Sequence, residues 1–282
     1  MGGSNVAPGE IPWAVAIFRD RSYYCTGTLI STKHLVTAAH CFATGLIRRP
    51  CDTSFGIYQK EAIERYTVLY GSNCIYQNSE YLCEDAPDMK MMQIVRAQYG
   101  RFFHGKCKTA DFALLELEDT IEDDPMVNYI CLPHRNIINK IKQTHLIGYG
   151  WGNTRDVYGQ KTMNNLQMIE FASLLNPIEC SNSYNDMPED VICTEETKTK
   201  STCQGDSGGG LAVSAPNGQW SLLGVLSFGS ECKRLQRGIP PNVQAYTDLS
   251  LYSMDIDMFT GYHDIIKSFH SLYIYTGNLS QQ

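Results

Sequence analysis

The chain has 282 residues, of which 43% are hydrophobic, so it can build a sizeable core in one or two folding units. Its formal net charge of −7, without any run of lysine or arginine, argues against binding to nucleic acid. No apolar run approaches the roughly 18 residues of a membrane span. Its 11 cysteines are too many for a reduced cytosol and indicate an oxidising compartment.

Short apolar stretches separated by glycine, asparagine, aspartate and proline turns predict an all-β protein. Regularly spaced short strands of this kind are typical of a barrel or a sandwich. The expected strands, in chain order, cover residues 13–18, 25–31, 34–39, 112–117, 145–151, 165–174, 210–215 and 220–228. Past about residue 251 the pattern is weaker, but Ile265, Ile266 and Phe269 fit one face of a short helix.

One serine, Ser207, lies inside the glycine-rich run GDSGGG at residues 205–210. A nucleophilic hydroxyl needs an approach that is clear of side chains, with backbone N–H groups near enough to hold the charge on an attacked carbonyl oxygen. Gly205 leaves room for that oxygen, and the N–H groups of Gly205 and Ser207 are candidate donors. By itself, such a serine more often marks an ordinary turn.

Two further residues supply the partners that a nucleophilic serine requires. Among the 7 histidines, His40 stands out because it follows small residues in TAAHC, and imidazole has a pKa suited to a general base. Asp111 heads the apolar run DFALLEL, which is expected to carry its carboxylate into the interior. A buried carboxylate without a partner is costly, and an imidazole N–H would satisfy it. We therefore predict a triad of Ser207, His40 and Asp111.

These motifs, in the chain order His, Asp, Ser, resemble those of the trypsin/chymotrypsin-like serine peptidases. Shorter matches at PGEIPW (8–13), GWG (150–152) and SFG (227–229) extend the resemblance. Together they cover the chain from about residue 2 to about residue 250.

The resemblance implies the fold as well. It implies two packed six-stranded antiparallel β-barrels, the first at about 13–130 and the second at about 131–250, with the triad in the cleft between them. It also implies a short C-terminal helix. We expect one peptidase domain over 1–260, a tail over 261–282, and a cysteine-containing insertion at about 44–107.

The resemblance further implies a serine endopeptidase that needs no metal or cofactor and acts on proteins or peptides. Ser207 would attack the peptide carbonyl, His40 would act as base and then as acid, and Asp111 would orient His40. The N–H groups of Gly205 and Ser207 would form the oxyanion hole, and Ser227 would hydrogen-bond near Asp111. The alternative is a weakly active or inactive serine-protease homologue that binds or regulates a partner, which the complete triad disfavours.

The cysteines fit this resemblance, which implies a secreted protein with three disulfides: Cys25–Cys41, Cys180–Cys193 and Cys203–Cys232. Four more cysteines have no assigned pairing: Cys51, Cys74, Cys83 and Cys107. A zinc site made from the last three and His104 is disfavoured, because their spacings fit no compact ligand pattern. Cys131 lies where many relatives bond to a pro-segment, and we expect its partner there.

Active relatives pair a newly exposed N-terminus with the aspartate before the nucleophile, which is Asp206 here. This chain starts Met1-Gly2-Gly3, so the two glycines match the family but the leading isoleucine is absent. It also lacks the apolar segment of a secretory signal. With the odd Cys131, these features indicate that the sequence lacks its natural N-terminal part.

The residue six positions before the nucleophile forms the floor of the substrate pocket in this family, and here it is Ser201. Without a carboxylate there, an arginine or lysine side chain would be desolvated without compensation. We therefore expect cleavage after bulky apolar residues rather than after arginine or lysine. Gly229 would leave one wall of the pocket open, and Asn242 or Gln244 could narrow the opposite wall.

Overall fold

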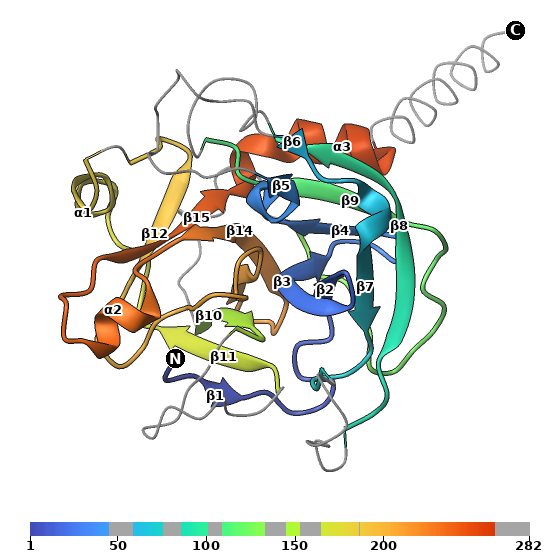
Figure 1. Cartoon of the computed structure of the whole chain (residues 1–282), viewed down its shortest axis with the longest axis horizontal. Helices are drawn as coiled ribbons and strands as arrows, with labels where there is room; N and C mark the ends of the chain where they lie inside the picture. Colours follow the sequence, from blue (N-terminus) through green and yellow to red (C-terminus); the bar gives the residue numbers. More distant parts are fainter. Residues whose placement is uncertain are drawn as a thin grey trace, which may run out of the picture.

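The computed structural model describes residues 1–44, 59–75, 86–100, 109–132, 145–152, 165–185 and 187–262. This part of the chain is built around two antiparallel β-sheets, which pack against each other (Figure 1). The predicted all-β class, with two packed sheets and a short C-terminal helix, is confirmed.

The first sheet is a closed barrel of six strands. Around the barrel the strands are β2 (Ala14–Arg19), β3 (Ser22–Leu29), β4 (His34–Thr37), β9 (Ala113–Leu117), β8 (Lys90–Tyr99) and β7 (Tyr66–Tyr70). Inward-facing side chains such as Val15, Leu35 and Leu115 are fully buried and fill the barrel.

The insertion expected at 44–107 needs correction, because β7 and β8 lie within it and complete this barrel. The described part of that range is therefore partly barrel core. A small two-stranded sheet of β5 (Ala43–Thr44) and β6 (Gln59–Lys60) and the short helix η2 (Ile63–Arg65) also fall in it.

The second sheet has seven strands rather than the six expected. Their order is β1 (Ser4–Asn5), β11 (Gln167–Phe171), β10 (His145–Gly150), β13 (Gly210–Ser214), β14 (Trp220–Phe228), β15 (Val243–Asp248) and β12 (Val191–Glu195). The extra strand is β1, which pairs with β11 at one edge. At the other edge, β12 approaches the chain that follows β11 through a single bridge between Leu174 and Thr194.

Short helices join and cover the sheets. They are η1 (Ala39–Phe42), α1 (Pro177–Asn182), α2 (Cys232–Gln236), η4 (Leu249–Tyr252) and α3 (Ser253–Thr260). Helix α3 follows the second sheet but packs on the first barrel, where the Arg96 guanidinium donates to the Phe259 carbonyl at 2.8 Å. The helical face predicted from Ile265, Ile266 and Phe269 lies outside the described residues. No helix in the described ranges has the length and apolar character to span a bilayer.

One buried cluster joins the two sheets. It includes Trp13, directly before β2, and Leu114 of the first sheet, with Tyr149 and Val225 of the second. A hydrogen bond of 2.7 Å between the hydroxyls of Thr28 and Tyr149 crosses the same interface. This shared core fixes how the loops of one sheet face the loops of the other.

Candidate active site

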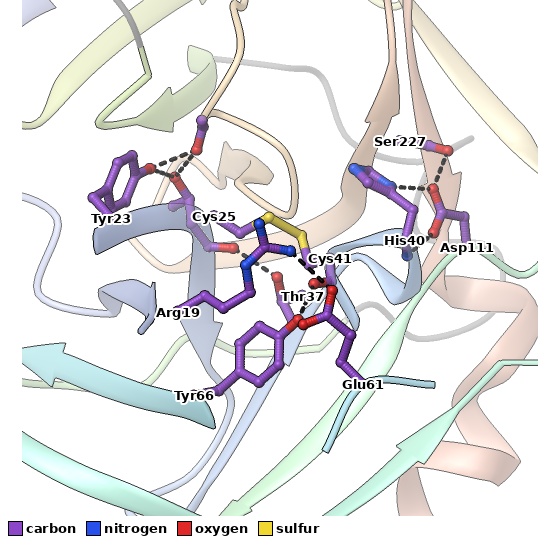
Figure 2. The surroundings of a disulfide bond; sticks show 12 residues. Arg19, Tyr23, Cys25, Thr37, His40, Cys41, Glu61, Tyr66, Asp111 and Ser227 are labelled. Atoms are coloured by element: carbon purple, nitrogen blue, oxygen red, sulfur yellow. Dashed lines mark hydrogen bonds and ion pairs between the residues drawn. A yellow bond between two sulfur atoms is a disulfide. The ribbon is translucent and has the colours of Figure 1, made fainter. Parts of the chain in front are cut away.

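The segment that carries His40 is fixed by a disulfide and a buried hydroxyl. His40 lies in η1, directly after β4, and the disulfide between Cys25 and Cys41 ties this helix to β3. The Tyr66 hydroxyl donates to the Cys41 carbonyl at 2.9 Å (Figure 2). The backbone around His40 is therefore anchored from two other strands of the barrel.

Asp111 reaches His40 because the register of two antiparallel strands brings their segments together. Thr37 of β4 lies opposite Ala113 of β9, so the residues just beyond these strand ends are neighbours. Nδ1 of His40 lies 2.8 Å from Oδ2 of Asp111, and the His40 backbone N–H donates to Oδ1 at 2.9 Å. The Ser227 hydroxyl, from the second sheet, donates to Oδ2 at 2.5 Å (Figure 2).

Burial and hydrogen bonding act in opposite directions on the pKa values of this pair. Burial disfavours the imidazolium of His40, but the charge and hydrogen bond of Asp111 together outweigh it and raise the pKa of His40. Burial also opposes the charge of Asp111, yet attraction to His40 and the hydrogen bonds from His40 and Ser227 leave the pKa of Asp111 lowered. The arrangement keeps the carboxylate charged and makes the imidazole a stronger base.

Ser207 lies in the turn before β13, where its backbone is held against the first barrel. The Thr26 N–H donates to the Ser207 carbonyl at 2.9 Å. The next residue, Gly208, has a φ of +81°, and a Cβ there would collide with Thr37 Oγ1 and the Thr26 carbonyl. No described residue hydrogen-bonds to the Ser207 hydroxyl, so direct contact between Ser207 and His40 stays a prediction.

The carbonyl of Gly205 is held by two hydroxyls of β3. Tyr23 donates to it at 2.5 Å and Thr26 at 3.2 Å. The φ of Gly205 is +102°, and a Cβ there would lie 3.0 Å from the Tyr23 ring. The loop before Ser207 is thus fixed from the first barrel, although no motif in the sequence marks Tyr23. The direction of the two predicted oxyanion-hole N–H groups stays a prediction.

Asp206 is buried beneath the same loop. Its carboxylate accepts the N–H of Gly152 at 2.7 Å and that of Cys203 at 2.7 Å. Burial raises the pKa of Asp206, while attraction to the N-terminal ammonium group of Met1 and the two backbone hydrogen bonds lower it in part. The ammonium nitrogen donates to the Ser201 carbonyl at 2.8 Å, and no ion pair within 4.0 Å joins it to Asp206 in the described part of the chain.

Ser207 lines a cavity of about 650 Å³, which we call the Ser207 pocket. Ser227 and Gly229, two of the three predicted pocket residues, also line it. The third, Ser201, is not among the lining residues: it is fully buried, and its hydroxyl donates to the carboxylate of Glu196 at 2.6 Å. No motif in the sequence marks Glu196.

Comparison with known proteins gives the family. The family model described as Trypsin matches residues 1–250. The chain belongs to the trypsin family. It is similar to the "Trypsin-like protease try-5" of Caenorhabditis elegans, with 30% identity over 259 residues, which cover 84% of this chain and 79% of that protein.

The three disulfides implied by the resemblance to this family are confirmed: Cys25–Cys41, Cys180–Cys193 and Cys203–Cys232. Cys74 is disulfide-bonded as well, which removes it as a ligand of the zinc site considered above. The other residues of that site, with Cys51, lie outside the described ranges. Cys131 is exposed and is the free cysteine of the described residues.

Proposed function

We propose that this trypsin-family chain is a serine endopeptidase that hydrolyses peptide bonds through an acyl-enzyme. The observation that carries the proposal is the hydrogen-bonded group of His40, Asp111 and Ser227, which adjoins the pocket that Ser207 lines. Because Nδ1 of His40 is hydrogen-bonded to Asp111, Nε2 is the ring nitrogen that would accept the proton of the Ser207 hydroxyl. The inactive-homologue alternative is not favoured, since all three triad residues are present.

In the first half-reaction the Ser207 oxygen attacks the carbonyl carbon of the substrate, and its proton passes to Nε2 of His40. The N–H groups of Gly205 and Ser207 would hold the oxyanion. His40 then gives the proton to the departing amine as the C–N bond breaks. In the second half-reaction a water molecule loses a proton to His40 and attacks the ester, and Ser207 leaves with that proton restored.

Hydrolysis of peptides by the full chain and by its Ser207→Ala variant tests the proposal. The parent chain should cleave a quenched fluorescent peptide library. If deacylation is slow, the first product should appear in a burst equal in amount to the enzyme. The Ser207→Ala variant should lose at least about 10⁴-fold in kcat. Equal cleavage by the two proteins would refute the proposed nucleophile.

We further propose that the chain acts outside the cell as the peptidase domain over residues 1–260 of a zymogen. The disulfides support an oxidising compartment. The exposed thiol of Cys131 supports a covalent link to a pro-segment. Mass spectrometry of the native protein under non-reducing conditions should find a peptide attached at Cys131, and a free thiol there would contradict the link.

A further inference from the structure

A buried carboxylate lies behind Gly229, one of the residues that line the Ser207 pocket. Glu196 follows directly after β12, and only 3% of its surface is exposed. Acidic side chains are rarely this buried unless they are paired, so its contacts matter.

The donors to this carboxylate from the described residues are neutral, and they come from three different segments. The Ser201 hydroxyl donates to Oε1 at 2.6 Å, the Ser230 N–H to Oε1 at 3.2 Å, and the Asn242 N–H to Oε2 at 3.1 Å. Such donors solvate a carboxylate but leave its charge uncompensated. Among the described residues, no lysine, arginine or histidine forms an ion pair with Glu196.

The carboxylate is separated from the pocket by a glycine that has no side chain. Gly229 lines the pocket, and a Cβ built on it would lie 3.4 Å from Oε1 of Glu196. The same Cβ would lie 3.6 Å from Cγ of Gln244. The space that a side chain of residue 229 would take is therefore open next to the negative charge.

Two side chains of opposite charge lie at the exposed mouth of the pocket. Glu231 and Lys233 both line it and both are exposed. Their charges are opposite and screened by water, so they contribute little selectivity. Glu196 is buried, and the nearby cation Arg234, whose charge acts on Tyr184 together with that of Glu196, forms no ion pair with it among the described residues.

From these contacts we infer that Glu196 is the specificity-determining residue of the pocket and selects substrates with arginine or lysine before the cleaved bond. This inference rests on the proposed peptidase function. A guanidinium or ammonium group that enters the pocket loses its water, and the Glu196 carboxylate supplies the compensating charge. An apolar side chain would leave that carboxylate buried without a counter-charge.

The carboxylate that Ser201 lacks is supplied by Glu196, so the expected preference for apolar residues changes to one for basic residues. Ser201 itself carries no carboxylate, but its hydroxyl donates to the carboxylate of Glu196, which lies only five residues earlier in the chain. A competing substrate is a neutral amide such as glutamine, because Nε2 of the buried Gln244 has no hydrogen-bond partner among the described residues. An amide side chain could accept from Gln244 and donate to Glu196, so glutamine must be tested beside arginine.

A binding test that needs no catalysis separates this inference from the proposed function. Calorimetry on the Ser207→Ala variant of the full chain would use benzamidine, a small aromatic cation, and benzamide, its neutral analogue. We expect benzamidine to bind more tightly than benzamide, and Glu196→Gln to weaken benzamidine binding about 100-fold. Equal binding of the two compounds, or an unchanged affinity in the Glu196→Gln variant, would overturn the inference even if the chain cleaves peptides.

The cleavage test compares peptides that differ only in the residue before the cleaved bond, with arginine, lysine, phenylalanine, glutamine or glutamate there. We expect arginine and lysine to be preferred, and Glu196→Gln to lower kcat/KM about 100-fold for arginine but less than about threefold for phenylalanine. Preference for phenylalanine, glutamine or glutamate, or an equal loss on all peptides, would overturn the inference.

Two variants keep the test independent of folding. Glu195→Gln removes the same charge from the exposed neighbouring residue and should leave arginine cleavage unchanged. In the Glu196→Gln variant, an added Ser201→Asp substitution places a carboxylate at the residue whose hydroxyl oxygen lies 2.6 Å from Oε1 of Glu196. We expect this double variant to have a kcat/KM for the arginine peptide at least about tenfold above that of Glu196→Gln alone. Failure of the restored charge to recover arginine cleavage would contradict a role of Glu196 through charge.

Discussion

Nδ1 of His40 and Oδ2 of Asp111 lie 2.8 Å apart, although 71 residues separate them in the sequence. The antiparallel pairing of β4 and β9 sets this distance, and a second hydrogen bond from the His40 backbone N–H to the same carboxylate fixes its plane. The carboxylate thus controls both the orientation and the tautomer of the imidazole.

Replacing Asp111 by asparagine tests that control. The amide cannot stabilise the imidazolium, and it favours the tautomer with the proton on the wrong nitrogen. We expect kcat to fall roughly 10⁴-fold in the Asp111→Asn variant while KM changes little. Steady-state kinetics with an ester or peptide substrate measures the loss, and a loss under about tenfold would contradict the assigned role.

The raised pKa of His40 makes a prediction about pH. Activity requires neutral His40, so it should fall as the pH drops through the pKa of His40, which burial lowers but Asp111 raises above the ordinary value of a histidine. NMR titration of the imidazole in the Ser207→Ala variant measures this pKa directly. Adding Asp111→Asn should move the midpoint downward, because the attraction that raises it is lost. A midpoint that stays in place would show that Asp111 does not set it.

Ser227 supplies a hydroxyl to the buried carboxylate from the other sheet. Its hydrogen bond to Oδ2 of Asp111 is 2.5 Å long, and hydrogen bonds to charged groups contribute roughly 1.5–3 kcal/mol. We expect Ser227→Ala to lower kcat/KM roughly 10- to 100-fold. Ser221→Ala is a matched control, because Ser221 has the same 9% exposure on the same strand, β14. Similar losses in the two variants would indicate a packing effect instead.

Tyr23 and Thr26 hold the carbonyl of Gly205, and removing one hydroxyl should loosen the loop before Ser207. We expect Tyr23→Phe to lower kcat about fivefold with little change in KM, since a single net hydrogen bond is worth about 1 kcal/mol. Tyr24→Phe is the control, because Tyr24 is also half-buried and contacts Arg19 instead. A rise in KM without a fall in kcat would show that Tyr23 shapes substrate binding rather than the loop.

Local motifs made part of this architecture predictable. The runs around His40, Asp111 and Ser207 identify the family, and the family in turn implies the disulfides that the structure contains. Strands with continuous apolar runs, such as β13 and β14, were found because their side chains are buried on both faces. These features depend on residues that are close in sequence.

Other features depend on contacts that local patterns do not carry. Strand β8 was assigned to an insertion because most of its side chains are exposed or half-buried, so no apolar run marks it. Glu196 follows the exposed Glu195, and nothing in its neighbourhood indicates that its carboxylate turns inward toward Ser201 and Asn242. Only the packing of three separate segments reveals it.

The central claim is that Ser207 is a nucleophile activated by His40, and covalent labelling tests it most directly. The full chain would be treated with a fluorophosphonate and digested, and the modified residue identified by mass spectrometry. We expect one adduct, on Ser207, formed at a rate that falls at least about 10³-fold in the His40→Ala variant. An adduct on another residue, or labelling of Ser207 at the same rate without His40, would contradict the claim.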